Sequence, residues 1–75
     1  MLSIGQVAEQ TNVSVRTLHY YDEIDLLKPS FVSESGYRYY GKDDLLRLHQ
    51  ILVLKKLGFT LSKIKEMLKK RCRNE

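Results

Sequence analysis

The 75-residue chain has few of the residues that build disulfides, cofactor sites and membrane spans. It contains one cysteine, one proline, two histidines and no tryptophan. Cys72 has no partner within the chain for a disulfide, and the chain has no cluster with metal-ligand spacing, so we expect a surface thiol, no metal and no other cofactor. The longest apolar run, residues 51–54, is far shorter than the roughly 20 apolar residues of a transmembrane helix.

The amino terminus also lacks the succession of charged, apolar and small residues that makes a secretory signal. We therefore expect a cytoplasmic protein without a membrane partner. The length suits one domain with a single core and is too small for a catalytic cleft between two lobes. A hydrophobic content of 43% with 29% charged residues is typical of folded chains. These features predict one domain over residues 1–75 that is not an enzyme.

Positive charge is concentrated after residue 25. The formal net charge is +4, yet residues 1–25 carry only Arg16 against four acidic side chains, a net charge of −3. The remaining residues carry a net charge of +7. A basic balance favours an acidic partner such as nucleic acid. If the partner is DNA, most of the attracting field must come from the later segments.

Three helix starts share one local signal, a hydroxyl residue in the N-cap position. Ser3 is followed three residues later by Gln6, which predicts a capping box, while Ser14 and Thr60 are predicted to cap a second and a late helix. Gly58 suits the left-handed residue that ends the helix before Thr60. Apolar pairs flank the three caps as hydrophobic staples: Leu2 and Val7, Val13 and Leu18, and Phe59 and Ile64. The first two helices are therefore short and joined by a tight turn.

The pattern changes between residues 27 and 41, where Pro29 is expected to stop the second helix. Strand-preferring residues surround a polar turn at residues 33–36, which predicts a β-hairpin. The expected order is a helix-turn-helix at about 3–24, a wing at about 30–41, and helices at about 43–57 and 61–71. The fold class is therefore mainly α with a small β-hairpin, a winged helix-turn-helix that places one helix in the major groove of DNA.

The second helix has one face suited to reading DNA. At about 100° per residue, Leu18 and Tyr21 share the inward face, whereas Arg16 and Tyr20 point outward with Thr17 and His19 on the flanks. A guanidinium in the first turn can bind guanine O6 and N7, and Tyr20 and His19 can donate to phosphates. The alternative is a solvated Arg16 and a half-buried packing Tyr20, and spacing alone leaves both interpretations open.

The ordered set of segments resembles the mercury-resistance regulator (MerR) family. The matching segments are IGQVAE at 4–9, VSVRTLHYYD at 13–22, LLKP at 26–29, GYRYY at 36–40, DLLRL at 44–48, LGFTL at 57–61 and IKEML at 64–68. They cover almost the whole chain. With His19 in the second helix, the sequence is most similar to the branch that activates multidrug-resistance and thiopeptide-resistance genes.

The resemblance implies a bacterial transcription activator that binds a near-palindromic promoter with an over-long spacer as a dimer. It acts on RNA polymerase indirectly, by distorting the DNA. The DNA-binding residues that the resemblance implies are Arg16, Thr17, His19 and Tyr20 in the second helix and Tyr37, Arg38 and Tyr39 in the wing. Tyr21 and Tyr40 look more like packing residues.

The sequence departs from the family pattern in three respects. Asp25 stands where the family usually has glycine, and His19 replaces an arginine that many members have. Such regulators also continue into a long coiled-coil helix and an effector-binding domain, so we expect either a piece of a longer, homodimeric regulator or a minimal relative. A helix over residues 61–71 is too short for a coiled-coil seam of three or more heptads, which predicts a monomer for the chain as given.

Two other classes of function are less economical. Basic residues make the carboxyl-terminal segment a basic amphipathic helix that could bind a membrane surface, but a domain this small needs its apolar side as core. An enzyme would have to use the histidines or the acidic pairs, which we interpret as surface and helix-start residues. The basic residues of this helix are Lys63, Lys65, Lys69, Lys70, Arg71 and Arg73. The histidines and acidic pairs that an enzyme would have to use are His19, His49, Asp22, Glu23, Asp43 and Asp44. Within DNA binding, the alternative is an excisionase-like architectural protein.

Overall fold

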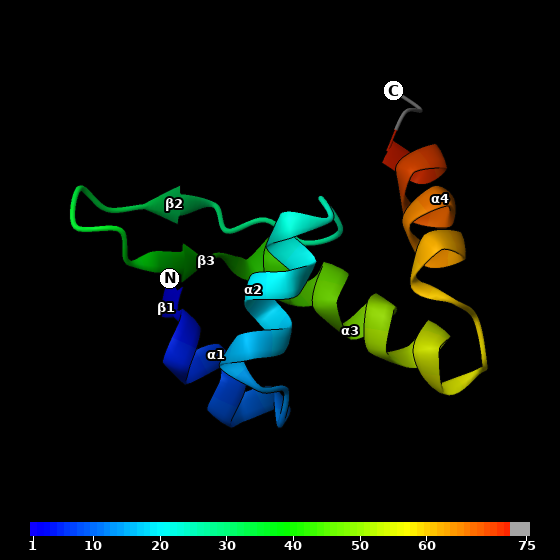
Figure 1. Ribbon diagram of the computed structural model, residues 1–75, viewed down its shortest axis with the longest axis horizontal. Coiled ribbons are helices and arrows are strands. Elements are labelled where there is room, and N and C mark those ends of the chain that lie inside the picture. Colours follow the sequence, from blue (N-terminus) through cyan, green and yellow to red (C-terminus); the bar gives the residue numbers. More distant parts are fainter. Residues whose placement is uncertain (73–75) are drawn as a thin grey trace.

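The computed structural model describes residues 1–72, with side chains through residue 69. The elements are β1 (Leu2–Ser3), α1 (Ile4–Thr11), α2 (Val15–Glu23), β2 (Phe31–Val32), β3 (Arg38–Tyr40), α3 (Lys42–Lys56) and α4 (Leu61–Cys72). The fold is mainly helical with a small antiparallel sheet, which confirms the predicted winged helix-turn-helix class (Figure 1). The expected surface position of the Cys72 thiol and the charges of Lys70 and Arg71 fall on side chains outside the described part of the structure, and Arg73 lies outside the described residues.

The three predicted N-caps are present. Ser3 and Gln6 form the reciprocal capping box, in which the Gln6 amide donates to Ser3 Oγ at 3.2 Å and the Ser3 amide donates to Gln6 Oε1 at 2.9 Å. Ser14 Oγ accepts from the Thr17 amide at 3.0 Å. Thr60 caps α4 in the same way. Each cap satisfies an amide that has no partner within its own helix, which fixes where these helices begin.

The end of α2 lies close to the predicted end of the helix-turn-helix at about residue 24, but the residue that stops the helix is not Pro29. The helix ends at Glu23, well before Pro29, because Asp25 adopts a left-handed conformation with φ of 59°. The Asp25 amide donates to the Asp22 carbonyl at 3.1 Å, and the Leu26 amide donates to the Tyr21 carbonyl at 2.8 Å. This pair of bonds is the Schellman motif, which turns the chain away from the helix axis.

A strand that was not predicted completes the sheet. The strand order is β1-β3-β2, with Leu2 opposite Tyr40 and Phe31 opposite Tyr39. In Figure 1 the β2–β3 hairpin projects to one side of the helices, and α4 stands at the opposite side. The strand β1 therefore ties the base of the hairpin to the start of α1.

The core lies where α1, α2, β3, α3 and α4 meet. Its buried residues are Val7, Leu18, Tyr21, Leu26, Leu27, Tyr40, Leu48, Ile51, Ile64 and Leu68. The helix α3 begins at Lys42, one residue earlier than predicted, and the Asp44 carboxylate accepts from the Gly41 amide at 2.8 Å. Arg47 Nε donates to the Leu26 carbonyl at 2.8 Å, which joins α3 to the turn after α2. The turn after α2 is thus held against α3.

Candidate nucleic-acid interface

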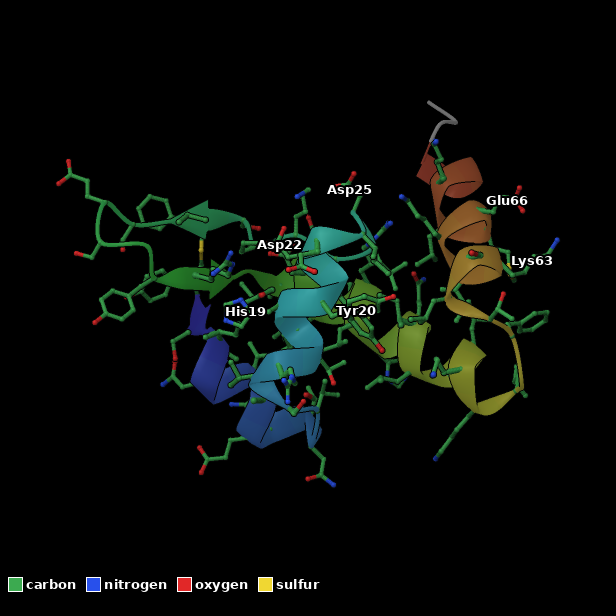
Figure 2. The ribbon with its side chains drawn as sticks, in the orientation of Figure 1. His19, Tyr20, Asp22, Asp25, Lys63 and Glu66 are labelled. Atoms are coloured by element: carbon green, nitrogen blue, oxygen red, sulfur yellow. The ribbon has the colours of Figure 1, made fainter. Side chains whose placement is uncertain are left out.

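The predicted contact residues of α2 lie along its accessible side. Arg16 is exposed and Tyr20 is 49% exposed, whereas Thr17 and His19 are half-buried. Figure 2 shows His19 on the side of α2 nearer the strands and Tyr20 on the opposite side. The inward residues Leu18 and Tyr21 are buried, so the predicted division of the helix into two faces is confirmed.

The first turn of α2 is built around Ser14 and Thr17. Ser14 Oγ accepts from the Thr17 amide and donates to the Thr17 hydroxyl oxygen at 2.9 Å. The two hydroxyls share this bond, and the Thr17 hydroxyl still has capacity for a second hydrogen bond. Arg16 lies in the same turn and is exposed. Free amides, a hydroxyl and a guanidinium at a helix start are suited to an anionic ligand.

The tip of the hairpin is a tight turn that presents Tyr37. The Gly36 amide donates to the Ser33 carbonyl at 2.9 Å, and Gly36 has a φ of 90°, the pattern of a three-residue loop with a bulge. The Ser33 hydroxyl accepts from the Tyr37 amide at 3.1 Å. Tyr37 is 66% exposed. The turn thus holds an aromatic side chain in solvent just before the start of β3.

The other two predicted wing residues are less accessible. Tyr39 is half-buried, and its ring lies 6.0 Å from the ring of Phe31 with a tilt of 37°. Arg38 is also half-buried, with its side chain 30% exposed. Its Nε donates to a carboxylate oxygen of Asp22 at 3.0 Å. One edge of the Arg38 guanidinium is therefore occupied within the protein.

Asp22 is the residue at which α2, the turn after it and the wing meet. Its carboxylate accepts from Arg38 Nε at 3.0 Å through one oxygen and from Lys28 Nζ at 2.8 Å through the other. Lys28 Nζ also lies 3.1 Å from a carboxylate oxygen of Asp25. The hydrogen bond from Lys28, aided by that from Arg38, lowers the pKa of Asp22.

Sequence reasoning did not single out the Asp22–Arg38 pair. The two residues are 16 positions apart, and their contact depends on how the hairpin folds back on α2. The only feature of the sequence that could have indicated this contact is the opposite charge of Asp22 and Arg38, which both lie in segments that resemble the family.

Tyr21 and Tyr40 are packing residues, as predicted. They are 4% and 1% exposed. Among the described residues, the Tyr40 hydroxyl is the one buried side-chain polar atom without a hydrogen-bond partner. Burial raises the pKa of Tyr40, and the charge of Asp22 raises it further, while the charge of Arg38 lowers it. The Tyr40 side chain is therefore part of the core rather than of the surface that could contact a ligand.

Over residues 1–72, none of the helices has the length and apolar character needed to cross a membrane. Within the same part of the chain, no three His, Cys, Asp or Glu side chains are placed to hold a metal ion.

An exposed helix of a helix-turn-helix beside a docked hairpin defines the winged helix-turn-helix class. The family described as MerR HTH family regulatory protein matches residues 2–71. The chain therefore belongs to the MerR HTH family of regulatory proteins.

Relatives and solved structures agree with this family. The HTH-type transcriptional activator mta of Bacillus subtilis is 57% identical over 87% of this chain and 25% of its own length. The HTH-type transcriptional activator TipA of Streptomyces coelicolor is 52% identical over 88% of this chain and 26% of its own length. The chain thus spans about a quarter of the length of these curated relatives.

The crystal structure of MtaN, the N-terminus of the Bacillus subtilis multidrug transporter activator, has a TM-score of 0.87 at 54% identity. The match covers 91% of this chain and 64% of that one. The cryo-EM structure of the EcmrR–DNA complex in EcmrR-RPo has a TM-score of 0.87 at 38% identity, over 97% of this chain and 27% of that one.

Proposed function

We propose that this chain is the DNA-binding domain of a MerR-type transcription regulator and binds double-stranded DNA in a sequence-specific manner. The observation that carries the proposal is the joining of two exposed elements, α2 and the hairpin, through the Asp22–Arg38 ion pair. A helix and a wing fixed to each other can contact the major groove and the flanking backbone at the same time. The membership in the MerR HTH family supports the same function.

The residues divide into two roles under this proposal. Arg16 reads a base, because an exposed arginine in the first turn of a recognition helix can bind guanine with two hydrogen bonds. The remaining contacts bind sugar and phosphate and set the register of the domain on the duplex. These backbone contacts are Thr17, His19, Tyr20, Tyr37, Arg38 and Tyr39.

The longer regulator, on this proposal, acts in the cytoplasm as a homodimer that reads a near-palindromic promoter and activates transcription. Two relatives are named transcriptional activators, and a neighbour of similar fold was solved as a DNA complex in EcmrR-RPo, which supports an effect on RNA polymerase through the DNA. A symmetric dimer places its two helices about one turn of DNA apart.

The experiment that tests the proposal is selection of bound duplexes from a random pool, followed by binding of the selected and scrambled duplexes. A common motif with binding at least about tenfold tighter than to the scrambled duplex is expected for specific recognition. Equal binding to all duplexes would contradict sequence specificity. Footprinting at a promoter that carries the motif, with RNA polymerase present, then separates a transcription regulator from an excisionase-like protein that only bends DNA.

A further inference from the structure

The carboxylate of Asp22 occupies an unexpected place for a domain that binds a polyanion. Asp22 follows the proposed contacts His19 and Tyr20 on α2 (Figure 2). The Asp22 side chain is 16% exposed. A negative charge close to a phosphate backbone weakens binding unless something offsets it, because the affinity of proteins for DNA depends on the phosphate charges they neutralise. We therefore expect the Asp22 carboxylate to contribute to binding in another way that offsets its repulsion of the phosphates.

The geometry around Asp22 supplies that contribution. Each carboxylate oxygen accepts a hydrogen bond from a different cation, Arg38 of the wing and Lys28 of the turn. Lys28 Nζ also donates to the Asp22 backbone carbonyl at 3.2 Å. A guanidinium bound through Nε keeps its two terminal nitrogens for another acceptor. Asp22 thus fixes the Nε edge of the Arg38 guanidinium and leaves N–H donors of the terminal nitrogens available to another acceptor.

We propose that Asp22 is a positioning residue for DNA binding, which holds Arg38 and the wing in the orientation that contacts a phosphate. This inference rests on the proposed function and adds to it a residue that does not itself touch DNA. Holding a long side chain in its bound orientation reduces the entropy that binding would otherwise lose. The gain in preorganised contact exceeds the repulsion between the carboxylate and the phosphates.

The sign of one substitution tests the proposal. Asp22→Asn removes a negative charge, so electrostatics alone predicts tighter binding to every duplex and a steeper salt dependence. Positioning predicts the opposite, because Arg38 loses its charged partner. We expect binding of the 75-residue chain to a fluorescein-labelled duplex that carries the selected motif to weaken by about three- to tenfold. The slope of log affinity against log salt should fall by up to about 1 as the Arg38 phosphate contact is lost.

Asp25→Asn is the matched control. It removes the same charge from the same cluster and releases Lys28 from one partner, but Asp25 makes no contact with Arg38 in the described residues. Asparagine also tolerates the left-handed conformation at this position. We expect unchanged or slightly tighter binding from this variant. Equal weakening by both substitutions would overturn the positioning role and point to the release of Lys28.

Two further measurements separate positioning from general damage. In an Arg38→Ala background, Asp22→Asn should no longer weaken binding, since the group that it positions is absent. In the free protein, the Nε–H signal of Arg38 in an NMR spectrum should exchange faster with water in Asp22→Asn while the thermal midpoint stays within a few degrees. Tighter binding by Asp22→Asn, or an unchanged Arg38 signal, would overturn the inference. If the parent chain binds no duplex at all, the proposed function fails, and this inference fails with it.

Discussion

Asp25 and Gly58 occupy the same position in two copies of one helix-ending motif. After α3, the Gly58 amide donates to the Lys55 carbonyl at 3.0 Å and the Phe59 amide donates to the Leu54 carbonyl at 3.2 Å, the same pattern of bonds that Asp25 directs after α2. Both residues have positive φ, 59° for Asp25 and 101° for Gly58. Glycine adopts this conformation without steric cost, whereas a residue with a Cβ does not.

Asp25→Gly should therefore stabilise the domain. Relief of the left-handed conformation favours the variant, and the greater entropy of glycine in the unfolded chain offsets part of the gain, leaving about 0.5–1 kcal/mol. The exposed ion pair with Lys28 contributes little to this balance. Urea unfolding of the two proteins measures the difference. Asp25→Ala, which keeps a Cβ and loses the carboxylate, should not stabilise the fold, and a gain from alanine equal to that from glycine would contradict the explanation.

Gly58→Ala should have the opposite effect. A Cβ placed on Gly58 meets no atom within 4 Å among the described residues, so its cost comes from the backbone conformation alone. We expect the free energy of unfolding to fall by about 1 kcal/mol. Gly5→Ala is the control, since Gly5 lies within α1 and its added Cβ would meet Ser3 Oγ only at 4.0 Å. A Gly58→Ala protein as stable as the parent would show that the turn can rearrange.

The two helix ends also show what could be predicted from the sequence. The caps at Ser3, Ser14 and Thr60 were predictable because each is a contact between residues three apart. The strand at Leu2–Ser3 was not, because two residues carry no pattern of their own and pair with β3 only after the hairpin has formed. The position at which α2 ends was predicted correctly at about residue 24, but its cause was assigned to Pro29, because positive φ is uncommon outside glycine and the sequence did not single out Asp25 for it.

In the candidate site too, some features could be predicted from the sequence and others could not. The outward position of Arg16 followed from helical periodicity, which depends only on local geometry. The accessibility of the wing residues did not follow, because Tyr39 packs on Phe31 across the sheet and Arg38 binds Asp22 across the domain. Periodicity predicts which face a side chain occupies within one element, but it carries no information about a neighbour from another element.

Tyr40→Phe should leave the domain as stable or make it more stable by up to about 1 kcal/mol. The Tyr40 hydroxyl is buried without a partner, and a buried donor that makes no hydrogen bond costs folding free energy, so its removal relieves that cost. Chemical unfolding of the variant and the parent tests this. Tyr20→Phe, at an exposed position, should change stability little. A loss of about 1 kcal/mol or more in Tyr40→Phe would indicate that the hydroxyl makes a stabilising contact.

The Asp22 ion pairs should make stability depend on pH in the acid range. The hydrogen bonds from Lys28 and Arg38 lower the pKa of Asp22 below its ordinary value of 3.8, so the folded state favours the charged carboxylate. The stabilisation from the charged carboxylate is fully present above the pKa that Asp22 has in the unfolded state. It is lost as the pH falls through the pKa that Asp22 has in the folded state. The difference in unfolding free energy between the parent and Asp22→Asn should therefore be constant near neutral pH and shrink below about pH 4. A difference that stays constant into strong acid would show that the carboxylate charge does not stabilise the fold.

Arg16→Ala should reduce both affinity and discrimination between DNA sequences. An arginine that binds guanine with two hydrogen bonds contributes about 1–3 kcal/mol, so the variant should bind the selected duplex more weakly by that amount while its binding to scrambled duplexes changes much less. Arg38→Ala is the contrasting variant: as a backbone contact, it should weaken binding to all duplexes alike and lower the salt slope by about 1. Fluorescence anisotropy with each single-base variant of the selected motif resolves the two patterns. If Arg16→Ala weakens binding to every duplex equally, Arg16 contacts only the backbone, and the base that α2 reads must be recognised by another residue of that helix.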